Sequence, residues 1–174
     1  FDMSVLIIAE IEGTTLKPST LACVGAGAQL PGPIHVLVMG AGVDGAAKST
    51  AAIHGVETVL VADAPHLADH IAENMTATIV DVIKSGGYTH VIAPATSFGK
   101  NVLPRVAARK RLVDRACELM LSHTDEPLSM LEVCQRVGAS RRKLNYCFQD
   151  VLGTNPVKYL RAVRLNGVRR ELRQ

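Results

Sequence analysis

The sequence predicts an α/β domain with a parallel sheet and flanking helices, followed by a small all-α domain, with one continuous helix joining the two. Strand-sized apolar runs alternate with helical segments in the first part, whereas only short amphipathic helices are indicated in the second. Charge divides the chain at the same place. Residues 1–108 carry 5 Lys and Arg against 9 Asp and Glu, a net charge of −4, and residues 109–174 carry 14 against 7, a net charge of +7. The basic second part therefore favours a polyanion as partner.

The predicted strands are continuous apolar runs, which are typical of strands covered on both faces of a parallel sheet. They are Ser4–Ala9, Ile34–Met39, Thr58–Ala62 and Thr89–Ala93. Helices are predicted between them at Pro18–Leu30, Val43–His54 and Leu67–Lys84, each ended by a glycine or by Pro-Gly-Pro. This alternation predicts βαβ units.

One further helix is predicted to belong to both parts of the chain. Asn101–Leu121 contains no Gly, and Pro104 is expected in the first helical turn, which tolerates proline. An apolar stripe starts at Val102, is interrupted by the basic residues 109–111 and resumes at Leu112. Two cores are therefore expected to share this helix.

Composition indicates a globular protein of the cytoplasm without a membrane partner. The apolar runs are far shorter than a membrane span, and the first residues lack the pattern of a signal peptide. The four cysteines form no C-x-x-C pair and have apolar neighbours, which favours reduced core thiols over disulfides or a metal site. They are Cys23, Cys117, Cys134 and Cys147.

A glycine motif follows the second predicted strand. Gly40-Ala41-Gly42-Val43-Asp44-Gly45 has the pattern G-x-G-x-x-G, and Asp63 ends the next strand at a distance that suits a ribose-binding acid. Taken alone, this pattern is typical of an NAD or FAD site. The alternative is a tight turn that lets strand and helix pack closely without any nucleotide.

Other polar residues of the first part have similarly plain explanations. His66 and His70 are four residues apart, a spacing that can hold a metal ion on a helix face, but the sequence offers no third ligand and a solvated face is the simpler interpretation. No Ser/His/Asp, Cys/His or paired-carboxylate arrangement is legible. We expect no catalytic residue, no metal site and no enzyme activity.

Several segments of the first part carry a resemblance to a known family. They are M-S-V-L-I-I-A-E, H-V-L-V-M-G-A-G, V-L-V-A-D-A and above all H-V-I-A-P-A-T-S-F-G-K-N-V-L-P-R-V-A-A. With them, residues 3–108 resemble the N-terminal domain of the electron transfer flavoprotein alpha subunit. The resemblance implies a Rossmann-like module that contacts a flavoprotein beta subunit, while FAD is held mainly by another domain of the alpha subunit. That domain is not in this sequence, so an incomplete Rossmann-like sheet, no cofactor-binding residue and no bound cofactor are expected.

The second part contains two helices in the pattern of a helix-turn-helix. Ser129-Met130-Leu131-Glu132 is a capping box for a helix that ends near Val137, and Ser140 caps the next helix. In Arg141–Asp150, one face is apolar, with Leu144, Cys147 and Phe148. The outward face holds the residues Arg141, Arg142, Asn145, Tyr146 and Gln149. A basic, amide-rich second helix is typical of DNA binding, and the alternative is a small helical bundle with a solvated basic face.

A second resemblance rests on L-x-x-C-x-x-V-G-A-S-R-R-K-L-x-x-x-F and on V-L-G-T-N-P-V-K-Y-L-R-A-V-R-L-N-G-V-R-R-E-L. With these segments, residues 110–172 are similar to the DNA-binding domain of the AraC/XylS transcription regulators, above all those of ethanolamine utilisation. The resemblance implies the first of that domain's two helix-turn-helix units and the helix that joins them, Pro156–Arg173.

The sequence therefore predicts a chimeric chain of two parts, 1–108 and 109–174, that binds DNA without catalysis. Base edges are assigned to Arg141, Arg142, Asn145 and Gln149, and phosphates to Lys143, Lys158 and Arg161. Half of a two-unit domain is expected to bind DNA weakly, and an uncovered strand edge to cause self-association. The alternative is an electron-transfer flavoprotein scaffold or interaction fragment whose basic part is incidental; a nicotinamide-binding enzyme ranks third.

Overall fold

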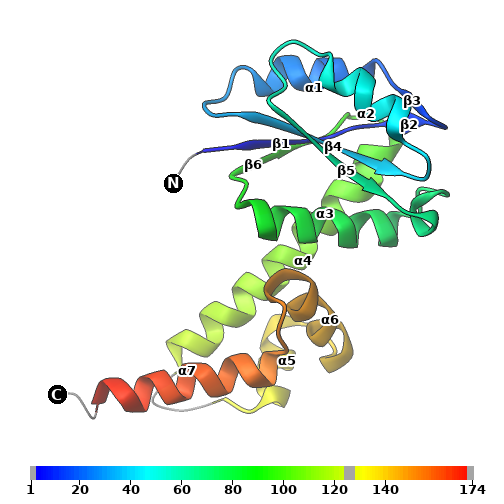
Figure 1. The fold of residues 1–174 in the computed structure, drawn as a ribbon. Coiled ribbons are helices and arrows are strands. Elements are labelled where there is room, and N and C mark those ends of the chain that lie inside the picture. Colours follow the sequence, from blue (N-terminus) through cyan, green and yellow to red (C-terminus); the bar gives the residue numbers. More distant parts are fainter. Residues whose placement is uncertain (1–2, 124–127, 172–174) are drawn as a thin grey trace. The chain divides into compact units, whose positions relative to one another are not determined.

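The computed structural model describes residues 3–123 and 128–171 and divides the chain into two compact units, Phe1–Val106 and Ala107–Gln174 (Figure 1). The first unit contains a parallel sheet with flanking helices, and the second is helical. The predicted fold class is therefore confirmed. The division between the units falls inside helix α4, which runs from Ser97 to Ser122.

The sheet of the first unit has the strand order β5-β4-β1-β6, and every neighbouring pair is parallel. Its strands are β1 (Val5–Ile8), β4 (Ile34–Gly40), β5 (Thr58–Asp63) and β6 (His90–Ile92). In the register, Ile7 of β1 lies between Val36 and Ile92. All four predicted strands are present, because each is an apolar run that only a sheet covered on both faces can bury.

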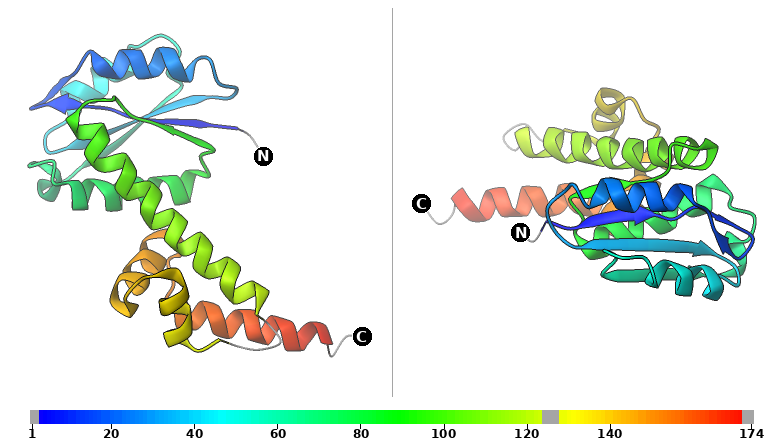
Figure 2. Two further views of the ribbon diagram at one scale, coloured as in Figure 1. Left: turned by 180° about the vertical axis from the view of Figure 1, so that it is seen from behind. Right: turned by 90° about the horizontal axis from the view of Figure 1, so that it is seen from above.

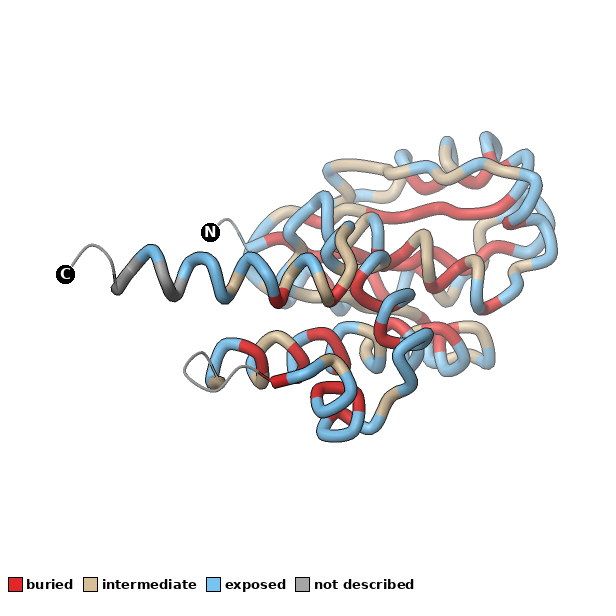
Figure 3. Tube along the Cα trace, turned by 90° about the horizontal axis from the view of Figure 1, so that it is seen from below, coloured by how far each residue is buried: buried red, intermediate tan, exposed pale blue. Residues whose placement is uncertain are grey.

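Helices cover both faces of this sheet. Helices α1 (Ser19–Gly27) and α2 (Asp44–Ala51) lie on one face, and α3 (Ala72–Gly86) lies on the other (Figures 1 and 2). Every residue of β1 is fully buried, and the buried parts of the trace follow the central strands (Figure 3). Gly87 caps the C-terminus of α3 and takes the left-handed conformation with φ of 64°.

Three short elements were not predicted. Strands β2 (Ile11–Glu12) and β3 (Thr15–Leu16) form a small antiparallel hairpin after β1. Pro65–Leu67 form a 3-10 helix, η1, and α3 begins only at Ala72, with His70 between them at φ of 49°. His66 and His70 therefore do not share a helix face, and the metal spacing considered for them does not arise.

Helix α4 begins four residues earlier than the sequence indicated. Because it starts at Ser97, Pro104 lies inside the helix, and the expectation of a first-turn proline is wrong. Proline cannot donate to the carbonyl group of Lys100, but Pro104 is exposed, so water can reach this part of the helix.

The second unit packs three further helices against residues 107–122 of α4. They are α5 (Met130–Val137), α6 (Arg141–Leu152) and α7 (Pro156–Glu171). A single buried cluster joins Val113 and Ala116 of α4 to Leu144 and Phe148 of α6. This core holds the outer face of α6 in place.

All four cysteines are free thiols. Burial raises the pKa of the Cys23, Cys117 and Cys147 thiols, so they stay protonated and unreactive at neutral pH. Among the described residues, no helix has a stretch long and apolar enough to span a bilayer.

We expect the protein to self-associate through the edges of its sheet. Strand β5 ends the sheet, and its Val61 is 49% exposed, so an unpaired backbone edge lies beside apolar surface. Light scattering at tens of micromolar should give a mass above 18.6 kDa, and Val61→Lys should lower it. Leu21→Lys, at a 51% exposed position of α1, is the control and should leave the mass unchanged. A strictly monomeric mass would contradict this prediction.

Candidate nucleic-acid interface

Helices α5 and α6 are fixed at their ends by the caps that the sequence predicts. The Ser129 hydroxyl accepts from the Glu132 N–H at 3.3 Å, and the Glu132 carboxylate accepts from the Ser129 N–H at 2.7 Å, which is a complete capping box. These hydrogen bonds lower the pKa of Glu132. Gly138 ends α5 with φ of 68°, and the Ser140 hydroxyl then accepts from the Lys143 N–H at 3.2 Å. The turn between the helices is thus defined by local hydrogen bonds.

Helix α6 presents one row of polar and aromatic side chains to solvent. At about 100° per residue, four exposed residues fall within an arc of about 100°, opposite the buried Leu144, Cys147 and Phe148. We call these four the outer stripe: Arg142, Asn145, Tyr146 and Gln149. The structure thus brings three of the predicted base-reading residues together on the most exposed part of the helix.

The other predicted DNA-binding residues lie outside this stripe and are all exposed. Arg141 and Lys143 lie on either side of it on α6. Lys158 and Arg161 lie about one turn apart on α7. The N-terminus of α7 is capped by Asn155, whose side-chain oxygen accepts from the Lys158 N–H at 2.9 Å.

An ion pair removes an acidic charge beside the outer stripe. Asp150 of α6 lies 3.5 Å from Nη1 of Arg109 on α4, and both side chains are about a quarter exposed. The same Nη1 atom is buried and has no hydrogen bond among the described residues. The pair fixes α6 against α4 and neutralises the one carboxylate of α6.

Tyr146 belongs to the outer stripe but was not among the predicted site residues. Its side chain is 59% exposed, and the Arg142 guanidinium carbon lies 5.7 Å from the centre of its ring. The helical spacing of Arg142, Tyr146 and Gln149 is visible in the sequence and could have identified it.

In the first unit, the side chain of Asp63 forms hydrogen bonds to the turn of the glycine motif. The two carboxylate oxygens of Asp63 accept from the Gly42 and Val43 N–H groups at 2.9 and 3.1 Å. In a dinucleotide site, backbone N–H groups of this turn would face the pyrophosphate, and the acid would bind the ribose. Here the acid fills the place of the anion. The tight-turn interpretation therefore fits the geometry, with Gly42 at φ of 69°.

We expect Asp63→Ala to loosen the turn before α2. Losing two hydrogen bonds at a partly exposed site should lower the free energy of unfolding by about 1 kcal/mol. Amide hydrogen exchange of residues 40–51 should rise, whereas Asp69→Ala, at an exposed position, should leave it unchanged. Equal exchange in the two variants would show that the Asp63 bonds are replaceable by water.

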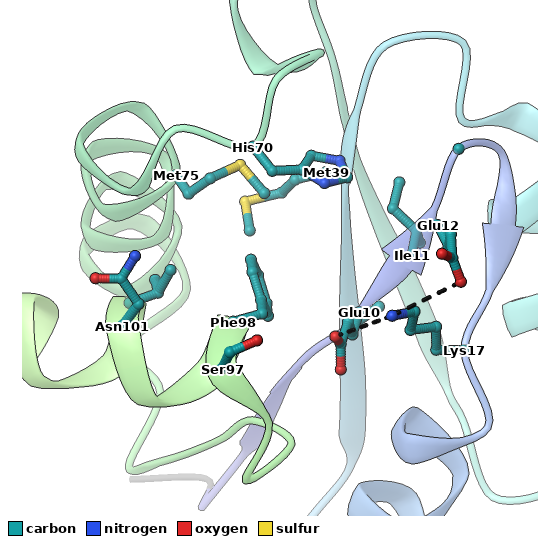
Figure 4. A pocket seen from close by; sticks show the side chains of 13 residues that line it. Glu10, Ile11, Glu12, Lys17, Met39, His70, Met75, Ser97, Phe98 and Asn101 are labelled. Carbon is teal, nitrogen blue, oxygen red and sulfur yellow. Dashed lines mark ion pairs between the residues drawn. The ribbon is translucent and has the colours of Figure 1, made fainter.

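A cavity of about 440 Å³ lies at the carboxyl ends of β1 and β4 (Figure 4). Its walls include Met39, Met75 and Phe98, with Glu10 and Lys17 at the polar side. The Glu10 carboxylate is already engaged, because it accepts from the hydroxyl groups of Ser19 and Thr96 at 3.0 and 2.9 Å and lies 3.6 Å from the Lys17 ammonium. Ser97 and Asn101 line the cavity as well. The buried acid thus connects three segments of the first unit.

No group of three or more acidic, His or Cys residues that could hold a metal ion occurs within the described ranges.

Both parts of the chain match a known domain family. The family model of the electron transfer flavoprotein domain matches residues 5–112. This chain belongs to the electron transfer flavoprotein domain family. A helix-turn-helix domain model matches residues 133–174, which confirms the AraC-like resemblance of the second part and the joining of two families in one chain. Both matched domains are of non-catalytic kinds.

Three curated relatives of this flavoprotein-family chain each align with 61% of it. The electron transfer flavoprotein subunit alpha of Pseudomonas aeruginosa is 45% identical over 106 residues, covering 61% of this chain and 34% of the relative. The mitochondrial alpha subunit of Oryza sativa subsp. indica is 41% identical over 112 residues, covering 61% and 31%. A probable mitochondrial alpha subunit of Caenorhabditis elegans is 36% identical over 106 residues, covering 61% and 32%. The chain spans about a third of the length of these relatives.

Proposed function

We propose that this chain binds duplex DNA through α6, as a transcription-regulator-like module without catalytic activity. The observation that carries the proposal is the outer stripe. It places an Arg, an Asn and a Gln on the solvent side of a capped helix whose opposite side is buried. Arg suits the O6 and N7 atoms of guanine, and Asn and Gln suit the N6 and N7 atoms of adenine. An α-helix of this kind fits the major groove of B-DNA.

Charge supports the same partner. Residues 109–174 carry 14 Lys and Arg against 7 Asp and Glu, and the Asp150 carboxylate on α6 is paired with Arg109. The exposed cations beside the stripe can then meet phosphates without local repulsion. We assign Lys143, Lys158 and Arg161 to phosphates, and we also place Arg141 nearer to a phosphate than to a base, because it lies at the margin of the stripe.

Fluorescence anisotropy with labelled duplexes tests the proposal. The 174-residue chain contributes one helix-turn-helix unit, so we expect a Kd near the non-specific range of about 10⁻⁴ to 10⁻⁶ M at physiological salt, with binding that weakens steeply as salt rises. Self-association that places two copies of the protein on one duplex would strengthen the binding to DNA. Arg142→Ala should weaken the binding free energy by about 1–3 kcal/mol on a preferred duplex and by less on random DNA.

Matched variants separate base contacts from charge. Lys158→Ala should weaken binding to all duplexes alike and reduce the salt slope by about one. Lys84→Ala removes the same charge from an exposed position of α3 and should change neither property. If alanine at Arg141, Arg142 and Asn145 leaves the affinity for every duplex unchanged at low salt, the DNA-binding proposal is wrong.

A scaffold role in electron transfer is the competing proposal, since the flavoprotein match covers residues 5–112. In that case the first unit would contact a flavoprotein subunit, and the second would bind polyanions only weakly. The same titration distinguishes the two proposals, because a scaffold fragment would show a shallow salt dependence that no single α6 variant alters.

A further inference from the structure

Tyr146 is an exposed aromatic residue in the middle of a surface that is otherwise polar. It lies outside the buried cluster of the second unit, and 59% of it remains exposed. Its position on α6 is central, with Arg142 one turn before it and Gln149 one turn after it. A ring in this place adds little to the core, so its chemistry is available to a partner.

The ring also supports the neighbouring guanidinium group. The Arg142 guanidinium carbon lies 5.7 Å from the centre of the Tyr146 ring, within the range of a cation–π contact. Among the described residues, the Arg142 side chain has no ion pair or side-chain hydrogen bond. Within the described part of the chain the ring is therefore its one directional contact, which leaves the guanidinium donors available to a base.

We propose that Tyr146 sets the sequence preference of α6 in two ways. This inference rests on the proposed DNA-binding function. The ring positions the Arg142 guanidinium toward the O6 and N7 atoms of a guanine, and its apolar surface contacts the C5-methyl group of a nearby thymine.

Helix geometry limits where that thymine lies. Arg142 and Tyr146 are separated by about 6 Å along the helix axis, at about 1.5 Å per residue. Successive bases of one strand are about 3.4 Å apart. The thymine is therefore one or two base steps from the guanine, and the preferred site of α6 contains both bases within that distance.

The test begins with the unmodified 174-residue protein and a randomised duplex library. Selection should yield a preferred sequence with a guanine and a thymine one or two steps apart. Tyr146→Ala should lower affinity for that duplex at least about fivefold, the lower end of what one good base contact supplies, and alter affinity for random DNA less than about twofold. Tyr146→Phe should restore most of the loss, because it keeps the ring and removes only the hydroxyl group.

Base analogues assign the contacts. Replacing the thymine by uracil removes the methyl group. This replacement should lower the DNA affinity of the unmodified protein but not that of Tyr146→Ala, so the effects of the base change and of the Tyr146 change should be non-additive. Replacing the guanine by 7-deazaguanine should weaken Tyr146→Ala less than the unmodified protein. Leu131→Ala, at a 67% exposed position of α5, is the control and should behave like the unmodified protein.

Three results would overturn the inference while leaving the proposed function intact. One is salt-dependent binding that Arg142→Ala weakens and Tyr146→Ala does not. Another is an equal loss in Tyr146→Phe and Tyr146→Ala, which would assign the hydroxyl group to a phosphate. The third is a selected sequence without the guanine and thymine pair. Absence of salt-dependent binding by the unmodified protein would instead refute the proposed function and this inference together.

Discussion

Phe148→Ala is expected to unfold the second unit while the first unit stays folded. Phe148 is fully buried in the cluster that joins α4, α5, α6 and α7, and its ring packs edge-to-face on Tyr159 with centres 5.8 Å apart. Truncating a buried Phe costs about 3–5 kcal/mol. That is comparable to the whole stability of a small domain, which is about 5 kcal/mol at the low end.

Hydrogen exchange followed by mass spectrometry measures each unit separately. Protection should fall in residues 107–123 and 128–171 and persist in residues 5–106, because the first unit has its own buried cluster around β1 and β4. Leu131→Ala removes a large but 67% exposed side chain of α5 and should change protection little. Loss of protection in both units of Phe148→Ala would mean that they unfold as one.

Elements defined by local chemistry were predictable from the sequence. The four strands are continuous apolar runs, and their predicted bounds differ from the observed ones by at most one residue at either end. The caps at Ser129 and Ser140 were legible because capping depends on residues three positions apart. The buried and exposed faces of α6 followed from its 3.6-residue period.

Features that depend on contacts distant in the sequence were not predictable. Strands β2 and β3 have two residues each, too few for any period to appear. The bonds from Asp63 to the Gly42 turn connect residues 21 positions apart, so the sequence left both interpretations of the glycine motif open. Tyr146 is a different case, because its four-residue spacing from Arg142 was visible in the sequence, and only the side-chain conformations that bring the two together were not.

The start of α4 was misplaced for a similar reason, and it leads to the other large expected effect. The predicted helix starts at Asn101, whereas Phe98 and Gly99 already lie in the first turn of α4. Gly99 is buried there, and a Cβ atom at this position would lie 1.9 Å from the carbonyl oxygen of Pro94. Only glycine allows the helix to begin so close to the segment that follows β6.

Gly99→Ala should therefore destabilise the first unit strongly, although alanine normally favours helices. The atom in the way is backbone, so relief requires a shift of the helix start or of Pro94, and we expect a cost of about 3 kcal/mol, the upper end for overpacking. Gly25→Ala in α1 is the matched control, since its Cβ atom would meet nothing within 4 Å. That variant should gain about 0.5–1 kcal/mol from helix propensity. Urea unfolding can be followed by hydrogen exchange of residues 5–106, and the midpoint urea concentration should fall in Gly99→Ala and rise in Gly25→Ala. A higher midpoint in both variants would mean that the Pro94 segment moves away from α4 without a cost in stability.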